Sequence, residues 1–205
     1  MALNLKASRL RRLRRAELPC DTIELARYLI GKTLVHESAA GRTSGRITET
    51  EAYAVGDAAG HAYRGQTPGN HSLFLERGTA YVYFTYGSAF MMNVASEKPG
   101  VGAGVLIRAL EPLEGIDLMQ RRRGGVKAID LTRGPGRLAM AMAIDKRLDG
   151  VDLCSRGSLW LGTAVRPIGL IGQSVRIGLT REVRRVLRFY ERGCKFVSGP
   201  KWLSP

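Results

Sequence analysis

Two β patterns on either side of a long loop are the feature that most constrains how this chain folds. Residues 46–53, RITETEAY, alternate polar and apolar side chains, which is typical of a β-strand. Residues 80–94, AYVYFTYGSAFMMNV, are typical of two aromatic-rich strands that meet at Gly87-Ser88, a two-residue hairpin turn with Tyr86 at its tip. The patterns therefore predict a sheet with a hairpin, on which ionisable and aromatic residues gather.

The first of these strands places acidic and phenolic side chains on one face. Side chains two residues apart share a face of an extended strand, so Glu49, Glu51 and Tyr53 lie together. The apolar run GVLIRAL, residues 104–110, predicts a further, buried strand in which Arg108 is the one charge. An unpaired buried guanidinium is too costly to keep, so Arg108 needs a partner, and a carboxylate such as Glu51 is a candidate.

The loop between the two β patterns, residues 54–72, is rich in Gly, Pro and Asn and is long for a compact domain. It carries His61, Tyr63 and Arg64, which are able to stack on a base or to form hydrogen bonds with one. A surface loop with incidental polar residues would have the same composition. Both interpretations stay open at this point.

The charge of the chain indicates a polyanionic partner. Its 205 residues carry 32 Lys and Arg against 18 Asp and Glu, a formal net charge of +14 at pH 7. Such a balance is typical of nucleic-acid binding, although proteins are also basic for other reasons. No composition shift divides the chain, so we expect one domain over residues 18–205, preceded by a basic arm over residues 1–17. Three interpretations of this arm stay open: a segment that binds DNA phosphates, an Arg-rich targeting peptide, or a solvated tail.

The cysteines and histidines do not predict a metal site. The three cysteines form no CxxC pair, which favours a reduced compartment, and the three histidines are too sparse for zinc. We therefore expect no metal cofactor. No apolar run approaches the roughly 20 residues that span a bilayer, so no membrane partner is expected either.

Three helices are predicted from their end signals. Asp21 caps the first, with Glu24 three residues later as in a capping box, and Gly31 ends it. Pro112 starts the second at the favoured first position. The third is rich in Ala and Met and follows the Gly-Pro-Gly of residues 134–136.

The third helix offers a phosphate-binding site. The free N–H groups at a helix N-terminus hold phosphates, and Arg133 and Arg137 stand beside this one. Later strands are predicted at SLWL, SVRIGL and LRFYE, residues 158–161, 174–179 and 187–191.

Several motifs in register carry a family resemblance. With ETEAY, the His61 loop, YVYFTYG, MMN, VLIRALEPLEG, GPGRL and LRFY in this order, residues 20–198 resemble the alkyladenine (3-methyladenine) DNA glycosylase family. The resemblance implies a single mixed α+β domain, with a curved antiparallel sheet flanked by helices and a protruding hairpin. It also implies a monomer without a cofactor that flips alkylated or deaminated purines out of double-stranded DNA. The enzyme would hydrolyse the N-glycosidic bond of bases such as 3-methyladenine, hypoxanthine or ethenoadenine, and would leave an abasic site where the base had been.

The resemblance assigns catalysis to two residues. Glu51 resembles the general base that activates the attacking water, and Arg108 resembles a residue that helps to hold this water. Glu49, on the same face, leaves open a two-carboxylate mechanism like that of sugar hydrolases. No lysine lies in the core motifs, so a Schiff-base lyase step is not expected.

The resemblance also assigns a base pocket. Tyr53, His61 and Tyr83 resemble the side chains that sandwich the extruded base, and Asn93 resembles the pocket-floor residue that discriminates against the amino group of guanine. Tyr86 resembles the side chain inserted where the base had been. Arg64, with the two arginines beside the third helix, is a candidate for phosphate contact.

Two other classes of protein remain as alternatives. In a non-enzymatic nucleic-acid-binding module, Tyr81, Tyr83 and Tyr86 would form a stacking platform and Glu51 would be an ordinary strand residue. A protein-interaction domain whose charge keeps it in solution does not account for the gathering of aromatic and carboxylate residues. An enzyme of this kind would be cytoplasmic and nucleoid-associated in a bacterium, or nuclear in a eukaryote.

Overall fold

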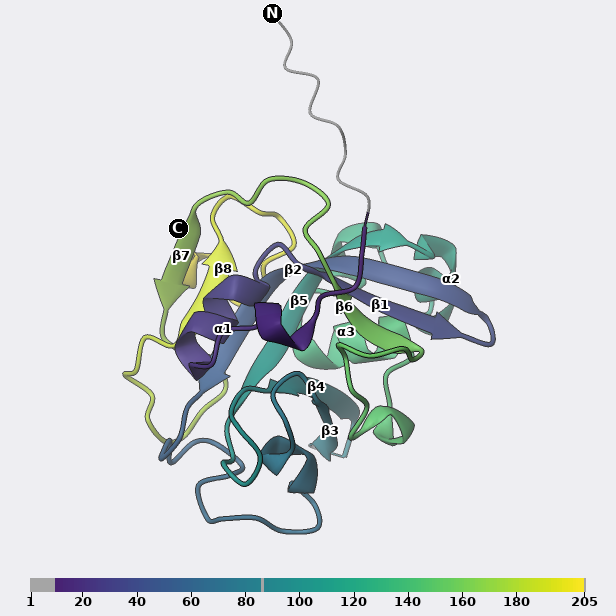
Figure 1. The fold of residues 1–205 in the computed structure, drawn as a ribbon. Coiled ribbons are helices and arrows are strands. Elements are labelled where there is room, and N and C mark those ends of the chain that lie inside the picture. Colours follow the sequence, from purple (N-terminus) through teal and green to yellow (C-terminus); the bar gives the residue numbers. More distant parts are fainter. Residues whose placement is uncertain (1–9, 86, 205) are drawn as a thin grey trace, which may run out of the picture.

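The computed structural model describes residues 10–85 and 87–204. A curled sheet of eight antiparallel strands runs through this part of the chain in the order β3-β4-β5-β2-β1-β6, and β8 pairs with both β2 and β7 (Figure 1). The strands are β1 (Thr33–Ser38), β2 (Gly41–Tyr53), β3 (Ala80–Thr85), β4 (Ala89–Ala95), β5 (Gly104–Glu114), β6 (Leu159–Gly162), β7 (Ile171–Ser174) and β8 (Arg188–Glu191).

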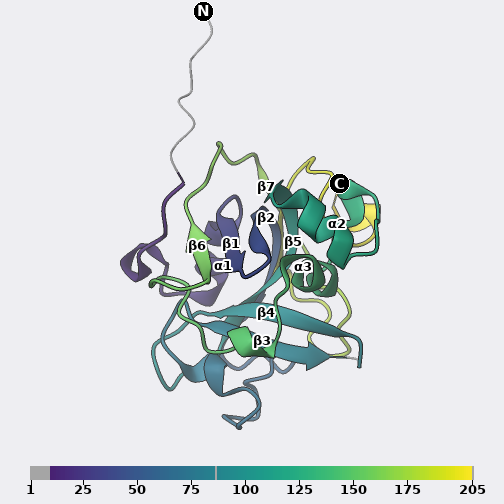
Figure 2. The same cartoon turned by 90° about the vertical axis from the view of Figure 1, so that its right-hand side faces the viewer.

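Helices cover both faces of the sheet. Helix α1 lies in front of strands β2 and β5 in Figure 1, whereas α2 and α3 lie behind the sheet. Figure 2 shows α2 and α3 side by side. The predicted α+β class is confirmed. The α-helices are α1 (Thr22–Leu29), α2 (Ile116–Arg122) and α3 (Pro135–Met142), and the 3₁₀ helices are η1 (Arg15–Glu17), η2 (His71–Phe74), η3 (Ala128–Asp130), η4 (Lys146–Leu148) and η5 (Lys201–Leu203).

Strand β2 is the centre of the sheet. Its first half pairs with β1 and its second half with β8 along one edge, while β5 pairs along the other. Residues 43–52 are therefore buried, including the polar side chains among them. The register of β2 against β5 shifts on both sides of Glu49, as at a β-bulge. Bulges re-aim side chains, and this one lies where the two carboxylates of β2 are found.

The first helix follows its sequence signals. The Asp21 side chain accepts hydrogen bonds from the backbone N–H groups of Ile23 and Glu24, which satisfies two otherwise free donors. Gly31, with φ of +82°, ends the helix as predicted. The helix buries Leu25 and Leu29 completely in the core, and each contributes about 1.5–3 kcal/mol by leaving water.

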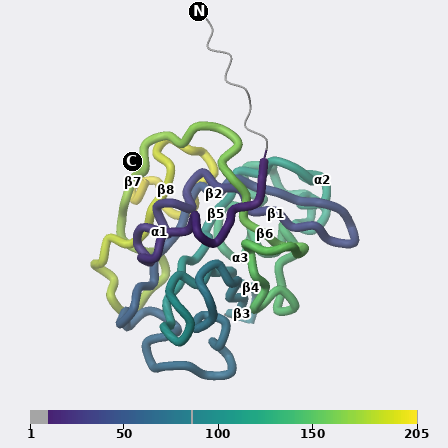
Figure 3. Tube along the Cα trace, viewed as in Figure 1, coloured from purple at the N-terminus to yellow at the C-terminus, as the bar shows by residue number. Residues whose placement is uncertain are grey.

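The predicted hairpin is confirmed. Strands β3 and β4 pair in register from Ala80 opposite Val94 to Thr85 opposite Ala89. The predicted two-residue turn at Gly87-Ser88 is wrong, because this register leaves three residues, 86–88, between the strands, and the N–H of Ser88 donates to the carbonyl of Thr85 over 3.1 Å. The loop of residues 54–79 projects from the sheet beside this hairpin, as the chain trace in Figure 3 shows.

Two sequence predictions are corrected. Pro112 does not start a helix: β5 continues through it, because it pairs with Gly45 at a register shift, and α2 begins only after Gly115. Gly115 has φ of +70°, and a Cβ there would lie 2.3 Å from the carbonyl oxygen of Arg42. The strand predicted over residues 174–179 lies earlier in the chain, as β7 (Ile171–Ser174), and it ends where the predicted strand begins.

Part of the expected basic arm belongs to the domain. Leu13 is 1% exposed, and its N–H donates to the carbonyl of Leu161 over 2.9 Å. Arg15 donates to Asp152 over 2.5 Å. Residues 1–9 lie outside the described residues, and Arg11 and Arg14 remain exposed, so phosphate contact by the basic segment of residues 1–17 stays a prediction.

Candidate active site

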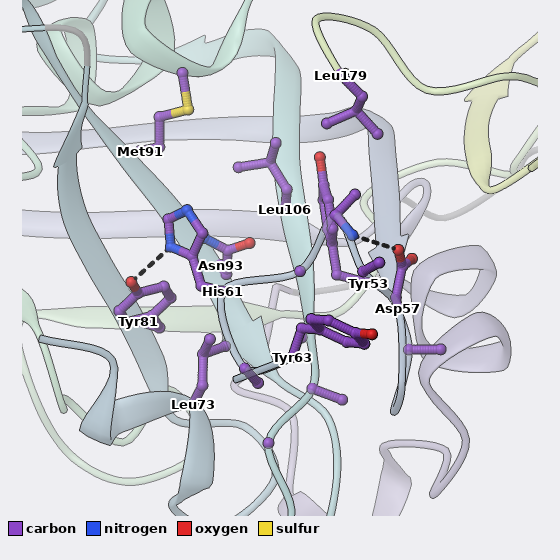
Figure 4. Close-up of a pocket in the computed structure, with 18 of the residues that line it drawn as sticks. Tyr53, Asp57, His61, Tyr63, Leu73, Tyr81, Met91, Asn93, Leu106 and Leu179 are labelled. Atoms are coloured by element: carbon purple, nitrogen blue, oxygen red, sulfur yellow. Dashed lines mark hydrogen bonds between the residues drawn. The ribbon is translucent and has the colours of Figure 1, made fainter. Parts of the chain in front are cut away.

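A cavity of about 620 Å³ opens beside the β3–β4 hairpin. The loop after β2, the strands β3, β4 and β5, and residues 177–181 after β7 contribute to its walls. Figure 4 shows Tyr53 and Leu179 on one side of the view and His61 and Tyr81 on the other. A wall that carries both aromatic rings and polar groups suits a flat ligand with polar edges, such as a base.

Glu51 lies directly behind this cavity and is fully buried. Three residues that line the cavity contact its carboxylate. The N–H of Ile177 donates to Oε1 over 2.8 Å, the hydroxyl of Tyr53 donates to Oε2 over 3.0 Å, and Arg108 Nη1 lies 3.2 Å from Oε1. An ionised carboxylate has about four acceptor positions, so these contacts leave one on Oε2 for a further donor.

The surroundings of Glu51 make it a stronger base than an exposed glutamate. Burial raises the pKa of Glu51 above its ordinary value, against the opposing effects of Arg108, the Ile177 N–H and Tyr53. Burial, and next the charge of Glu51, also raises the pKa of Tyr53, so its hydroxyl stays protonated and donates. The arrangement can accept a proton at Glu51 from a molecule in the cavity.

Arg108 joins Glu51 to the second carboxylate of β2. Its Nε donates to Glu49 Oε1 over 2.8 Å, so the prediction that a carboxylate such as Glu51 pairs with Arg108 is confirmed, with Glu49 as a second partner. Glu49 and Glu51 are both fully buried, and neither is among the residues that line the cavity. They differ in their partners: all three partners of Glu51 line the cavity, whereas Glu49 accepts from Arg188 and from the N–H of Ser198, which do not, and only Arg108 connects it to the cavity. The structure therefore does not favour a reacting role for Glu49.

Aromatic rings gather at the mouth of the cavity. The His61 and Tyr83 ring centroids lie 4.3 Å apart, and the Tyr81 and Tyr83 rings stack at 5.1 Å. His61 Nδ1 also forms a 2.8 Å hydrogen bond with the Tyr81 hydroxyl, drawn as a dashed line in Figure 4. Partial burial lowers the pKa of His61, which favours the neutral imidazole near pH 7. The structure thus brings Tyr53, His61 and Tyr83 to one cavity, while their roles stay predictions.

Asn93 lines the same cavity and has a buried side-chain donor without a partner in the part of the chain that the structure describes. It lies on β4 opposite Tyr81 and is 6% exposed. Within the described residues its Nδ2 has no hydrogen-bond partner. A buried amide donor without a partner is costly, so a ligand acceptor that meets it gains affinity and orientation.

The three arginines predicted to contact phosphate have no contact with Glu51 or with the aromatic rings of the cavity among those described above. Arg64 is exposed on the loop after β2. Arg133 and Arg137 flank the first turn of α3, and each has Nη1 3.7 Å from Asp130 Oδ1, which partly neutralises them. Phosphate contact by these three arginines stays a prediction. Tyr86 lies outside the described residues.

Sequence reasoning missed a buried pair behind Tyr53. Arg176 Nη1 donates to Asp57 Oδ2 over 2.5 Å and to the carbonyl of Ala52 over 2.9 Å. The Arg176 guanidinium also lies 4.6 Å from the centre of the Tyr53 ring. An arginine between the apolar residues Val175 and Ile177 was the available signal, since a charge there needs a partner as Arg108 does.

Within the described residues, neither a metal site nor a membrane-spanning helix is present. No group of three or more His, Cys, Asp or Glu side chains within residues 10–85 and 87–204 is arranged to hold a metal ion. No helix in the same ranges is long and apolar enough to cross a membrane.

Comparison with known proteins decides the family. Residues 16–195 match the family model described as methylpurine-DNA glycosylase (MPG). The chain belongs to this family. Over 190 residues it is 62% identical to a protein of Mesorhizobium japonicum named "Putative 3-methyladenine DNA glycosylase", covering 93% of this chain and 91% of that protein. A protein of the same name from Paraburkholderia phytofirmans is 53% identical over 191 residues, covering 93% and 90%.

The methylpurine-DNA glycosylase family accounts for the features already described. Its members are DNA glycosylases, hydrolases of base excision repair, and the resemblance drawn from the motifs is confirmed. A DNA substrate also agrees with the net charge of +14.

Proposed function

We propose that this methylpurine-DNA glycosylase flips alkylated or deaminated purines out of duplex DNA into the cavity and hydrolyses their N-glycosidic bond. The observation that carries the proposal is the placement of Glu51. Its carboxylate, raised in pKa and held by three cavity-lining residues, lies behind a wall of aromatic rings. A base bound between such rings would bring its sugar toward this carboxylate.

The proposed reaction needs one general base. The oxygen of a water molecule forms a bond to C1′ of the deoxyribose, and the C1′–N bond breaks with its electron pair leaving on the purine. The proton of the water passes to Glu51, and the negative charge of this carboxylate also stabilises positive charge on the sugar. Arg108 would hold the water beside Glu51. A cationic purine such as 3-methyladenine leaves as a neutral base, whereas neutral hypoxanthine needs an additional proton.

The pocket residues would select the base by its positive charge and by the hydrogen-bonding groups on its edge. The faces of Tyr53, Tyr83 and the neutral His61 attract a cationic alkylated purine by about 0.5–2 kcal/mol per contact. Asn93 would select against guanine, because a donor that faces the base leaves the exocyclic amino group of guanine without an acceptor. Lesions in this range include 3-methyladenine, hypoxanthine and ethenoadenine.

Duplex oligonucleotides with one lesion each test the proposal. After incubation with the enzyme and treatment with alkali, strands should break at 3-methyladenine, hypoxanthine and ethenoadenine, and not at normal purines. Tight binding to each lesion without breaks would instead support a non-enzymatic binding module.

Asn93→Ala should weaken discrimination between hypoxanthine and guanine, which differ by the amino group alone. We expect the ratio of their excision rates to fall by roughly tenfold or more, since the groups that reject the amino group set this ratio. Stability should change little, because Nδ2 of Asn93 has no partner within the described residues. Single-turnover excision of both bases, with a thermal melt of the variant, checks this. An unchanged ratio would contradict the role of Asn93.

Tyr86→Ser should preserve thermal stability but reduce the fraction of flipped base by roughly tenfold or more, because an inserted flat side chain offsets the few kcal/mol of unstacking. In the sequence Tyr86 directly follows Thr85, the last residue of β3, and the turn pattern predicts it at a hairpin tip, where a large side chain gains little burial. A fluorescent lesion whose emission rises on unstacking measures the flipped fraction. The loss should be smaller for a weakly paired lesion. A lower melting temperature with normal flipping would make Tyr86 a core residue instead.

A further inference from the structure

Glu49 is a buried carboxylate for which the proposed reaction has no use. Its Oε1 accepts from Arg108 Nε over 2.8 Å and from Arg188 Nε over 2.7 Å, and its Oε2 accepts from the N–H of Ser198 over 2.6 Å. It is fully buried and is not among the residues that line the cavity. Any effect of Glu49 on the reaction therefore passes through the groups that it holds.

Arg188 fixes Glu49 from the opposite side. It is fully buried, and each of its five N–H groups has an acceptor. A guanidinium that is saturated in this way cannot turn, so it gives Glu49 a fixed position. The acceptors are Glu49 Oε1, Ser174 Oγ, the carbonyls of Ser198 and Leu203, and Ser204 Oγ.

Arg108 is shared between the two carboxylates of β2. Its Nε is hydrogen-bonded to Glu49 at 2.8 Å, whereas its Nη1 lies 3.2 Å from Glu51 Oε1. The guanidinium is planar and rigid, so fixing Nε sets the position from which Nη1 faces Glu51. Without Glu49, Arg108 could turn toward Glu51 and form a closer, two-pronged pair. Such a pair would occupy the remaining acceptor position on Oε2 and would make Glu51 a weaker base.

We propose that Glu49 is a positioning residue that holds Arg108 in place and shares its charge, so that Glu51 stays oriented and basic enough to activate water. This inference rests on the proposed function of Glu51. The two arginines and two glutamates balance in charge, which makes a buried cluster of this kind tolerable. The neighbouring Glu49 charge also acts to raise the pKa of Glu51. The charged and titratable groups that act on Glu51 are Arg108 on β5 and Tyr53 and Glu49 on β2. Two further arginines lie one contact away: Arg176, after β7, lies against the Tyr53 ring, and Arg188, on β8, pairs with Glu49.

The pH dependence of single-turnover base release tests this inference in the full chain with Glu49→Gln. The amide keeps the shape of the side chain but removes its charge. The acid limb of the profile should move to lower pH, because Glu51 then faces Arg108 without a competing anion. The plateau rate should fall by roughly 10-fold to 10²-fold, as for a misplaced catalytic group. Affinity for the lesion should stay near that of wild type, because Glu49 does not line the cavity.

Glu191→Gln is the matched control. Glu191 is also a buried carboxylate of the same sheet, paired with Arg46 and with the N–H of Gly169, and it is not among the residues that line the cavity. It should lower stability without moving the acid limb. A merely structural role for Glu49 predicts that the two variants behave alike, and that result would overturn the inference.

Two further variants complete the test. If Glu49→Gln does not fold, Glu49→Asp retains the charge on a shorter side chain. It should lower the plateau rate and move the acid limb toward higher pH, in the opposite direction to Glu49→Gln, because it draws Arg108 away from Glu51. A wild-type plateau rate in folded Glu49→Asp would overturn the inference. Full activity in Glu51→Gln would instead contradict the proposed function of Glu51. The experiment therefore distinguishes an error in the role of Glu49 from an error in the role of Glu51.

Discussion

Replacing Glu51 by glutamine is expected to lower the single-turnover rate of base release by roughly 10²–10⁴-fold, the usual loss when a general base is removed. The amide can keep the contacts of the carboxylate. Its oxygen can accept from Arg108 and the Ile177 N–H, and its NH₂ can donate to the Tyr53 hydroxyl oxygen. Affinity for a duplex with a lesion should therefore stay near that of wild type. Rapid-quench kinetics and fluorescence anisotropy measure the two quantities separately.

The pH profile of the wild type belongs to the same prediction. A general base works only when ionised, so the rate falls as pH drops through its pKa. Because burial raises the pKa of Glu51, this fall should begin at higher pH than for an ordinary exposed glutamate. The limb should disappear in Glu51→Gln. Base release by that variant at a normal rate, with the limb intact, would show that another group is the base.

Arg108→Gln is expected to have the second-largest effect. It removes a buried charge from between Glu49 and Glu51, and breaking a buried pair in this way costs about 3–5 kcal/mol of folding stability. The two carboxylates then repel each other, so the pKa of Glu51 should rise further and the acid limb should move to higher pH. The plateau rate should fall by roughly 10²-fold because the water is no longer held. Urea unfolding and the pH–rate profile check both effects.

Arg46→Gln separates lost stability from lost chemistry. Arg46 is fully buried, pairs with Glu191, and is not among the cavity-lining residues. It should lower the free energy of unfolding to a similar extent while leaving the acid limb in place. An Arg108 variant with the pH profile of Arg46→Gln would show that Arg108 acts only on the stability of the fold.

Local patterns predicted the parts of the site that lie on single strands. Alternation placed Glu49 and Glu51 together, and Gly87 between two aromatic-rich runs located the hairpin, although not the length of its turn, because both signals depend on neighbouring residues. The rule that a buried charge needs a partner led from Arg108 to Glu51. These predictions hold in the structure.

Contacts between distant segments could not be predicted in this way. Asp57 and Arg176 are 119 residues apart in the sequence, and Glu49 and Arg188 are 139 apart. No local pattern specifies which of the many arginines a buried carboxylate meets. The basic character of residues 1–17 likewise concealed Leu13, which the core buries although its neighbours are charged. The helix start predicted at Pro112 was wrong because a strand tolerates proline where the register shifts.

The most direct test of the account is the identification of the released product. A duplex with a single 3-methyladenine is incubated with excess wild-type enzyme, and free purine and abasic DNA are quantified together by mass spectrometry. If Glu51 is the general base, the wild type should release one free purine for each abasic site, and Glu51→Gln should form neither product within the same time. Tight binding of the wild type to the lesion with no free purine, or equal release by both proteins, would contradict this prediction.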